Sequence, residues 1–129
     1  MNAVHPDGQV VMVVEDELLV ATTLEAALED GGYRVLGPVA TVPAAIGLLR
    51  TSPPDMALID YRLAATTTET LLASLKSRHI PVCVLTGCGA SQLPPAYTGL
   101  TVLEKPVRTR TLMATLNRIA STNSPHAVE

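Results

Sequence analysis

Short apolar runs alternate along this chain with longer amphipathic stretches, and this alternation constrains its fold more than any other feature. We expect strands at 9–14, 33–39, 56–60, 82–85 and 101–103. We expect helices over 17–30, 41–50, 68–78 and 108–120. Such a succession of βα units is typical of an α/β domain, with a doubly wound, five-stranded parallel sheet that carries helices on both faces.

Local signals refine this arrangement. The Thr41 hydroxyl is positioned to cap the second helix. The first helix should turn Leu18, Leu24 and Leu28 towards the core. Residues 87–99 are rich in glycine and proline, so the region of a fourth helix between the last two strands should be short or irregular.

Length and composition indicate one globular domain over 9–120, with a flexible N-terminus at 1–8 and a flexible tail at 121–129. A formal net charge of −3 gives no basic face for nucleic acid, and no apolar run approaches a membrane span. The N-terminus lacks the features of a signal peptide, so we expect a cytoplasmic protein. Cys83 and Cys88 match no metal or redox spacing and are expected to be reduced thiols.

Polar side chains that could bind a ligand or take part in a reaction lie where the predicted strands end. Glu15 and Asp16 follow the first strand, Asp60 ends the third, Thr86 follows the fourth and Lys105 follows the fifth. Each residue alone is more often a cap, a turn residue or solvated surface. In a parallel sheet, however, these ends share one edge, which is where such folds bind ligands. Three carboxylates, a hydroxyl and an ammonium should therefore converge there.

The run VVMVVEDE at 10–17 ends in three consecutive acids, which form either a solvated helix start or a cation site. Mg²⁺ is a hard cation that takes oxygen ligands. Without metal, three carboxylates this close would repel one another, and at least one pKa should be raised. We therefore interpret Glu15 and Asp16 as metal ligands and keep the helix-start interpretation for Glu17 alone.

These motifs resemble the receiver domain of bacterial two-component response regulators. The resemblance extends over residues 9–120 and rests on VVEDE at 13–17, LIDYRL at 58–63, LTG at 85–87 and EKP at 104–106. It implies a flavodoxin-like sheet with strand order 2-1-3-4-5. It also implies a cis peptide bond between Lys105 and Pro106.

The resemblance implies a role for each site residue. Asp60 would be the phosphoacceptor, with Mg²⁺ held by Asp60, Asp16, Glu15 through water, and the backbone carbonyl of Arg62. Thr86 and Lys105 would grip the phosphoryl oxygens. Arg62 and Cys88, each two positions past a site residue, would tune the lifetime of the acyl phosphate.

The expected function follows from this site. No nucleotide-binding loop is present, so the phosphoryl donor should be another protein, and the resemblance implies a phosphohistidine on a histidine kinase or histidine phosphotransfer protein. About nine residues follow the last predicted helix, so we expect a single-domain response regulator without an output domain. It would signal by protein contact, or relay or drain phosphate, and would be no enzyme beyond its own autophosphatase activity.

The chain also departs from the usual receiver pattern. Val102 stands where receivers often carry an aromatic residue that reorients on phosphorylation, and Tyr97 could substitute only if its loop folds back. Residues 64–68, AATTT, replace the usual Pro and Gly of the loop after the phosphoacceptor, so this partner-facing loop should have unusual geometry.

Two other functions compete with the phosphoacceptor. One is a pseudo-receiver that binds proteins without being phosphorylated, although a scaffold has no physical need for three unpaired carboxylates at one edge. The other is a flavodoxin-like cofactor protein, which would want a hydroxyl-rich phosphate loop and stacking aromatics instead of an acidic first loop. The fold does not separate these functions, so the site must.

Overall fold

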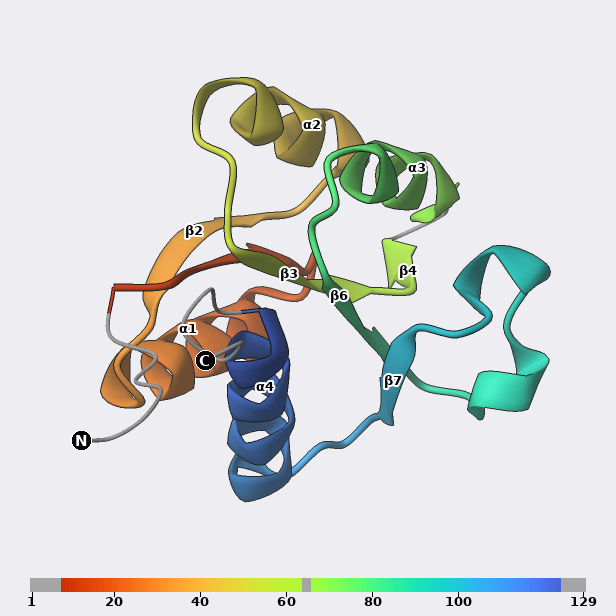
Figure 1. Ribbon diagram of the computed structural model, residues 1–129. Helices are drawn as coiled ribbons and strands as arrows, with labels where there is room; N and C mark the ends of the chain where they lie inside the picture. Colours follow the sequence, from red (N-terminus) through yellow and green to blue (C-terminus); the bar gives the residue numbers. More distant parts are fainter. Residues whose placement is uncertain (1–7, 64–65, 124–129) are drawn as a thin grey trace.

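A computed structural model describes residues 8–63 and 66–123, and its centre is a parallel sheet (Figure 1). The five strands are β1 (Val10–Val14), β2 (Arg34–Val39), β3 (Met56–Asp60), β6 (Val82–Thr86) and β7 (Thr101–Glu104). They lie in the order β2-β1-β3-β6-β7, and all four neighbouring pairs are parallel. Counted among these five strands alone, the order is 2-1-3-4-5, so the predicted fold is confirmed.

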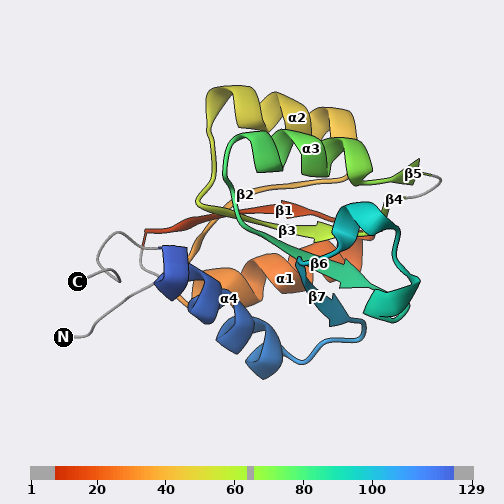
Figure 2. The same cartoon turned by 45° about the vertical axis from the view of Figure 1, so that its right-hand side comes forward.

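Helices cover both faces of this sheet. They are α1 (Leu18–Asp30), α2 (Val42–Thr51), α3 (Glu69–Ser77) and α4 (Thr109–Asn123). Figure 2 shows α2 and α3 above the sheet, with α1 and α4 below it. The α4 helix continues three residues beyond the predicted boundary at 120. The rest of the predicted tail, and residues 1–7, lie outside the described residues.

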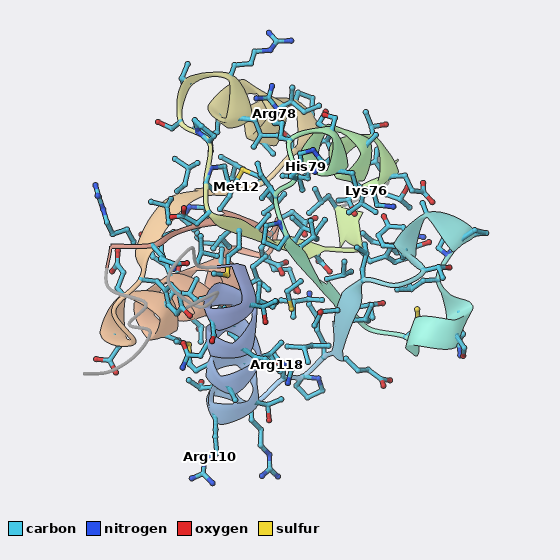
Figure 3. All side chains as sticks on the ribbon, in the orientation of Figure 1. Met12, Lys76, Arg78, His79, Arg110 and Arg118 are labelled. Carbon is cyan, nitrogen blue, oxygen red and sulfur yellow. The ribbon has the colours of Figure 1, made fainter. Side chains whose placement is uncertain are left out.

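The core is divided by the sheet because successive side chains of a strand point to opposite faces. Met12 and Val14 pack with residues of α2 and α3, whereas Val11 and Val13 pack with residues of α1 and α4. Figure 3 labels Met12 on the α2–α3 side. The core is mainly aliphatic, and each half also contains one buried tyrosine, Tyr97 or Tyr33.

Local predictions had mixed outcomes. The Thr41 side chain accepts a hydrogen bond from the Ala44 N–H at 3.2 Å, which confirms the predicted cap. On α1, Leu24 and Leu28 are buried, but the prediction for Leu18 was wrong, since 82% of Leu18 is exposed. Leu18 is the first residue of α1, at the sheet edge where the core ends.

Two segments that were expected to be loops or irregular have local structure. β4 (Arg62–Leu63) and β5 (Thr66–Thr67) pair antiparallel directly after β3, although the Ala64-Ala65 part of the predicted loop lies outside the described residues. Between β6 and β7, the expected short or irregular helix consists of two 3₁₀ turns, η1 (Ala90–Gln92) and η2 (Pro95–Tyr97). A 3₁₀ turn suits a proline-rich segment because proline lacks the N–H that a longer helix would need.

None of the helices in the described part of the chain is long and apolar enough to cross a bilayer.

Candidate functional site

The register of the sheet brings the acidic residues at the ends of β1 and β3 together. β1 and β3 pair with Val14 opposite Ile59, so the residues that follow, Glu15 and Asp60, lie side by side where the strands end. Glu15, Asp16 and Asp60 each offer a carboxylate oxygen, and these oxygens all lie within 4.8 Å of one another. Glu15 and Asp60 are buried and Asp16 is more exposed.

The Lys105 ammonium lies among these carboxylates. Its Nζ is 3.1 Å from Asp60 Oδ2 and 3.2 Å from Glu15 Oε1. The backbone N–H of Lys105 donates to the Thr86 carbonyl at 2.7 Å, which ties the end of β7 to the end of β6. The Lys105–Pro106 peptide bond is cis, as predicted, and a second cis bond joins Gly37 to Pro38.

Burial and charge oppose each other in this cluster. Desolvation raises the pKa of Glu15 and of Asp60, and their repulsion from neighbouring carboxylates adds to it. Lys105 reduces this effect in both residues. For Lys105 itself, burial lowers the pKa, but the hydrogen bonds and charges of Asp60 and Glu15 outweigh it, and the net shift is upward. The raised carboxyl pKa expected from the sequence is thus present at Glu15 and Asp60.

Glu15 also answers the question of the helix start. Its Oε2 accepts a hydrogen bond from the Glu17 N–H at 3.1 Å, while its Oε1 accepts from Lys105. Glu17 stands at the N-cap of α1, but its own side chain makes no capping hydrogen bond. Glu15 therefore supports the start of α1 and binds Lys105 at the same time, whereas Glu17 contributes only its backbone. The prediction that Glu17 alone serves the helix start was wrong.

Thr86 and Cys88 form one wall of a pocket beside Asp60. The Thr86 Oγ1 accepts a hydrogen bond from the Cys88 N–H at 3.1 Å and lies 3.2 Å from the Cys88 Sγ. The pocket has a volume of about 390 Å³ and is lined by Asp60, Tyr61, Arg62, Thr86, Gly87, Cys88 and Lys105. A hydroxyl that accepts from a backbone N–H keeps its own proton free to donate, so Thr86 can bind an anionic oxygen there.

The buried residues Tyr97 and Thr68 form a group with the half-buried Tyr61, which lines this pocket. The 3₁₀ segment does fold back, and only 2% of Tyr97 is exposed. The hydroxyl of Tyr97, however, is hydrogen-bonded to Thr68 at 2.8 Å, on the α3 side of the sheet. The rings of Tyr97 and Tyr61 meet edge to face, with their centres 5.1 Å apart.

Sequence patterns did not reveal Thr68 as part of this group. A weak signal exists, because a chain with three tyrosines and no phenylalanine or tryptophan is expected to bury them, and a buried tyrosine hydroxyl requires a partner. That requirement does not identify the partner, which depends on how the 3₁₀ segment folds.

Comparison with known proteins relates this site to one family. The model of the response regulator receiver domain matches residues 11–117. A protein-glutamate methylesterase/protein-glutamine glutaminase of Anaeromyxobacter dehalogenans is 33% identical over 92 residues, which are 70% of this chain and 25% of that protein. The chain therefore spans about a quarter of the length of this relative.

Solved structures show the same fold. A response regulator receiver domain protein from Methanospirillum hungatei superposes with a TM-score of 0.82 at 20% identity, covering 91% of this chain and 97% of that one. The signal receiver domain of a modulated diguanylate cyclase from Desulfovibrio desulfuricans has a TM-score of 0.77 at 28% identity, with coverage of 91% and 97%.

Proposed function

This chain belongs to the response regulator receiver domain family, and we propose that it accepts a phosphoryl group on Asp60 in a magnesium-dependent reaction. The observation that carries the proposal is the arrangement around Asp60. Its buried carboxylate is bound by Lys105 at 3.1 Å and shares one pocket with the Thr86 hydroxyl. A nucleophile, a cation and a hydroxyl donor around one cavity suit the transfer of a phosphoryl group.

The proposed transfer is a substitution at phosphorus. An oxygen of the Asp60 carboxylate attacks the phosphorus of a phosphohistidine, a P–O bond forms, and the P–N bond to the imidazole breaks. The imidazole leaves with the electron pair of that bond and takes up a proton. Negative charge on the phosphoryl oxygens is stabilised by the Lys105 ammonium and by a hydrogen bond from Thr86. Hydrolysis of the acyl phosphate then restores Asp60 and releases phosphate.

The residues present fit a divalent cation. Three carboxylates and one ammonium leave two negative charges when all are ionised, and one divalent cation would neutralise them. Oxygens of Asp16, Asp60 and Glu15, with the Arg62 backbone carbonyl, are the donors that Mg²⁺ prefers. Bound there, the ion would supply further positive charge to the transferring phosphoryl group.

Arg62 and Cys88 are proposed to set how long the phosphoryl group lasts. Both line the pocket beside Asp60, and the side chain of Arg62 is exposed at its rim. Side chains at these positions can admit or hinder the water that hydrolyses the acyl phosphate. We propose that the phosphorylated chain acts by protein contact or passes its phosphoryl group on.

The proposed donor is a histidine kinase or a histidine phosphotransfer protein. Leu18 and Leu19 are the largely exposed large apolar side chains of the described residues, at 82% and 81%. Leu19 lines a mainly apolar groove that also includes Lys105 and Pro106, so the groove begins at the site itself. An apolar rim of this kind suits a protein surface better than a small anionic donor.

Metal dependence tests the proposed function directly. With acetyl phosphate or phosphoramidate as the donor, intact-mass spectrometry should find one added phosphoryl group in the presence of Mg²⁺. With a chelator the modification should fall to background, because the carboxylates would then repel the anionic donor. Fragment mapping should place the group on Asp60. A folded protein that takes up no phosphoryl group with Mg²⁺ would instead be assigned to the pseudo-receiver function.

The donor surface has a separate test. Serine at both Leu18 and Leu19 should slow transfer from a phosphorylated histidine phosphotransfer protein that serves the wild-type chain by about tenfold, since apolar contact area is lost. The rate with phosphoramidate should not change, because both side chains point to solvent. Equal slowing with both donors would mean that these leucines support the site itself and not the contact with the donor protein.

A further inference from the structure

Two side-chain hydroxyls and one backbone carbonyl next to the site form a hydrogen-bonded series that the phosphoryl transfer itself does not use. The Tyr97 hydroxyl is 2.8 Å from Thr68 Oγ1, and Thr68 Oγ1 donates to the Tyr61 carbonyl at 3.2 Å. Thr68 is fully buried and only 2% of Tyr97 is exposed. In the described part of the chain, no buried side-chain oxygen or nitrogen lacks a hydrogen-bond partner.

The donor and acceptor in each of these two hydrogen bonds follow from the number of hydroxyl protons available. A threonine hydroxyl has one proton, and here the Tyr61 carbonyl can only accept it. Thr68 must therefore accept a hydrogen bond from the Tyr97 hydroxyl. Tyr97 donates to Thr68, and Thr68 donates to the Tyr61 carbonyl. The two hydroxyls act as a unit, since removal of either leaves a buried group of the other without its partner.

The receiving carbonyl belongs to a residue that lines the pocket beside Asp60. Tyr61 is the residue between Asp60, the proposed phosphoacceptor, and Arg62, whose carbonyl is the proposed metal ligand. On its other side, the Tyr61 N–H donates to the Leu85 carbonyl at 2.8 Å, immediately before Thr86. Both backbone groups of Tyr61 are thus held, one by the end of β6 and the other by Thr68.

We propose that Tyr97 and Thr68 are positioning residues for phosphoryl transfer. They hold the backbone at Tyr61 so that Asp60 and the Arg62 carbonyl face Glu15 and Asp16. This inference rests on the proposed function of Asp60. It also gives the 3₁₀ segment a role, since η2 carries Tyr97, whose hydroxyl contacts Thr68 directly before α3.

Val102 cannot supply the hydrogen bond that Tyr97 makes. In β7 it pairs with Val84 and packs in the same half of the core as Tyr97. Valine has no hydroxyl to hold a neighbouring backbone group. The aromatic ring and the hydroxyl come instead from η2, and they act on the chain after β3.

The test compares two tyrosines that differ in location but match in environment. Tyr33 is also buried, at 3% exposure, and its hydroxyl also makes one hydrogen bond, to Asn117 Oδ1 at 2.6 Å. It lies in the other half of the core. Tyr97→Phe and Tyr33→Phe should therefore lower the melting temperature by similar amounts of a few degrees, since each loses one buried hydrogen bond.

Only the first variant should affect the site. We expect Tyr97→Phe and Thr68→Val to slow phosphorylation by saturating phosphoramidate about five- to tenfold, the equivalent of one hydrogen bond. Thr68→Ser, which keeps the hydroxyl, should restore the rate, and Tyr33→Phe should match the wild type. In the unphosphorylated protein, NMR should find the Tyr61 amide proton exchanging about five- to tenfold faster in Tyr97→Phe but not in Tyr33→Phe.

The outcomes separate this inference from the proposed function. Wild-type rates and wild-type Tyr61 exchange in Tyr97→Phe and Thr68→Val would overturn it. It would also be overturned if Tyr33→Phe slowed phosphorylation as much as Tyr97→Phe, because general loss of stability would then explain both. If the wild-type chain took up no phosphoryl group, the proposed function would fail on its own. The exchange of Tyr61 would then decide whether Tyr97 holds this peptide.

Discussion

Asp60→Asn is expected to take up no phosphoryl group from any donor that modifies the wild-type chain. The amide is neutral and lacks the carboxylate oxygen that would attack phosphorus, whereas its size and shape are nearly those of aspartate. In the wild type, Lys105 Nζ donates to Asp60 Oδ2 at 3.1 Å. In the variant it can donate to the amide oxygen instead, so the pocket should persist. Intact-mass spectrometry after treatment with phosphoramidate and Mg²⁺ measures this directly.

The same variant should be more stable than the metal-free wild type at neutral pH. Burial raises the pKa of Asp60, so folding disfavours its ionised form. Wild-type stability should therefore fall as the pH rises from the unfolded-state pKa through the raised folded-state value. Asparagine removes this penalty, and we expect a gain of about 1 kcal/mol in the free energy of unfolding above that window and none below it. Urea denaturation across the pH range would measure both.

Asp55→Asn is the matched control. Asp55 precedes the same strand, β3, at the opposite edge of the sheet, and its Oδ2 accepts a hydrogen bond from the Val10 N–H at 2.7 Å. The substitution is chemically identical but distant from the cluster, so phosphorylation should proceed as in the wild type. A phosphoryl group found on folded Asp60→Asn would show that another residue is the acceptor.

The sequence was sufficient to predict the sheet because the strands are short, apolar and separated by helices. Glu15, Asp60, Thr86 and Lys105 each follow or end a predicted strand, so their convergence follows from the parallel topology without any knowledge of tertiary contacts. A pattern of one polar residue after each buried run is a local signal. A local signal predicts the position of a residue in the fold when few alternative topologies are possible.

Features that depend on irregular segments could not be predicted in this way. Burial of Tyr97 depends on the path of the segment that carries η1 and η2, and its bond to Thr68 joins residues 29 positions apart. Leu18 fits the apolar spacing of α1, but the spacing does not reveal that the first turn extends beyond the core. Periodicity identifies the face of a helix, whereas the extent of the opposing surface is a tertiary property.

Lys105→Met is expected to separate metal binding from phosphoryl transfer. Methionine retains the length of the side chain but removes the ammonium that binds Glu15 Oε1 and Asp60 Oδ2. Phosphorylation by phosphoramidate should slow by about 10²- to 10³-fold, as when one charged donor to a developing anion is lost. Mg²⁺ should nevertheless bind more tightly, by about tenfold, because a cation that repels it is gone while the three carboxylates remain.

Opposite signs make this prediction specific, since general unfolding would weaken metal binding and phosphorylation together. Lys105 also lowers the pKa of Glu15 and Asp60, so in the metal-free variant both values should rise further and the total loss of stability with rising pH should be larger. The control is Lys76→Met, a substitution of the other lysine of the chain, which is exposed on α3 and should change neither property beyond twofold. Calorimetric titration would measure Mg²⁺ binding to both proteins. Weaker binding by Lys105→Met than by the wild type would contradict the prediction, because Lys105 would then organise the carboxylates for the metal instead of competing with it.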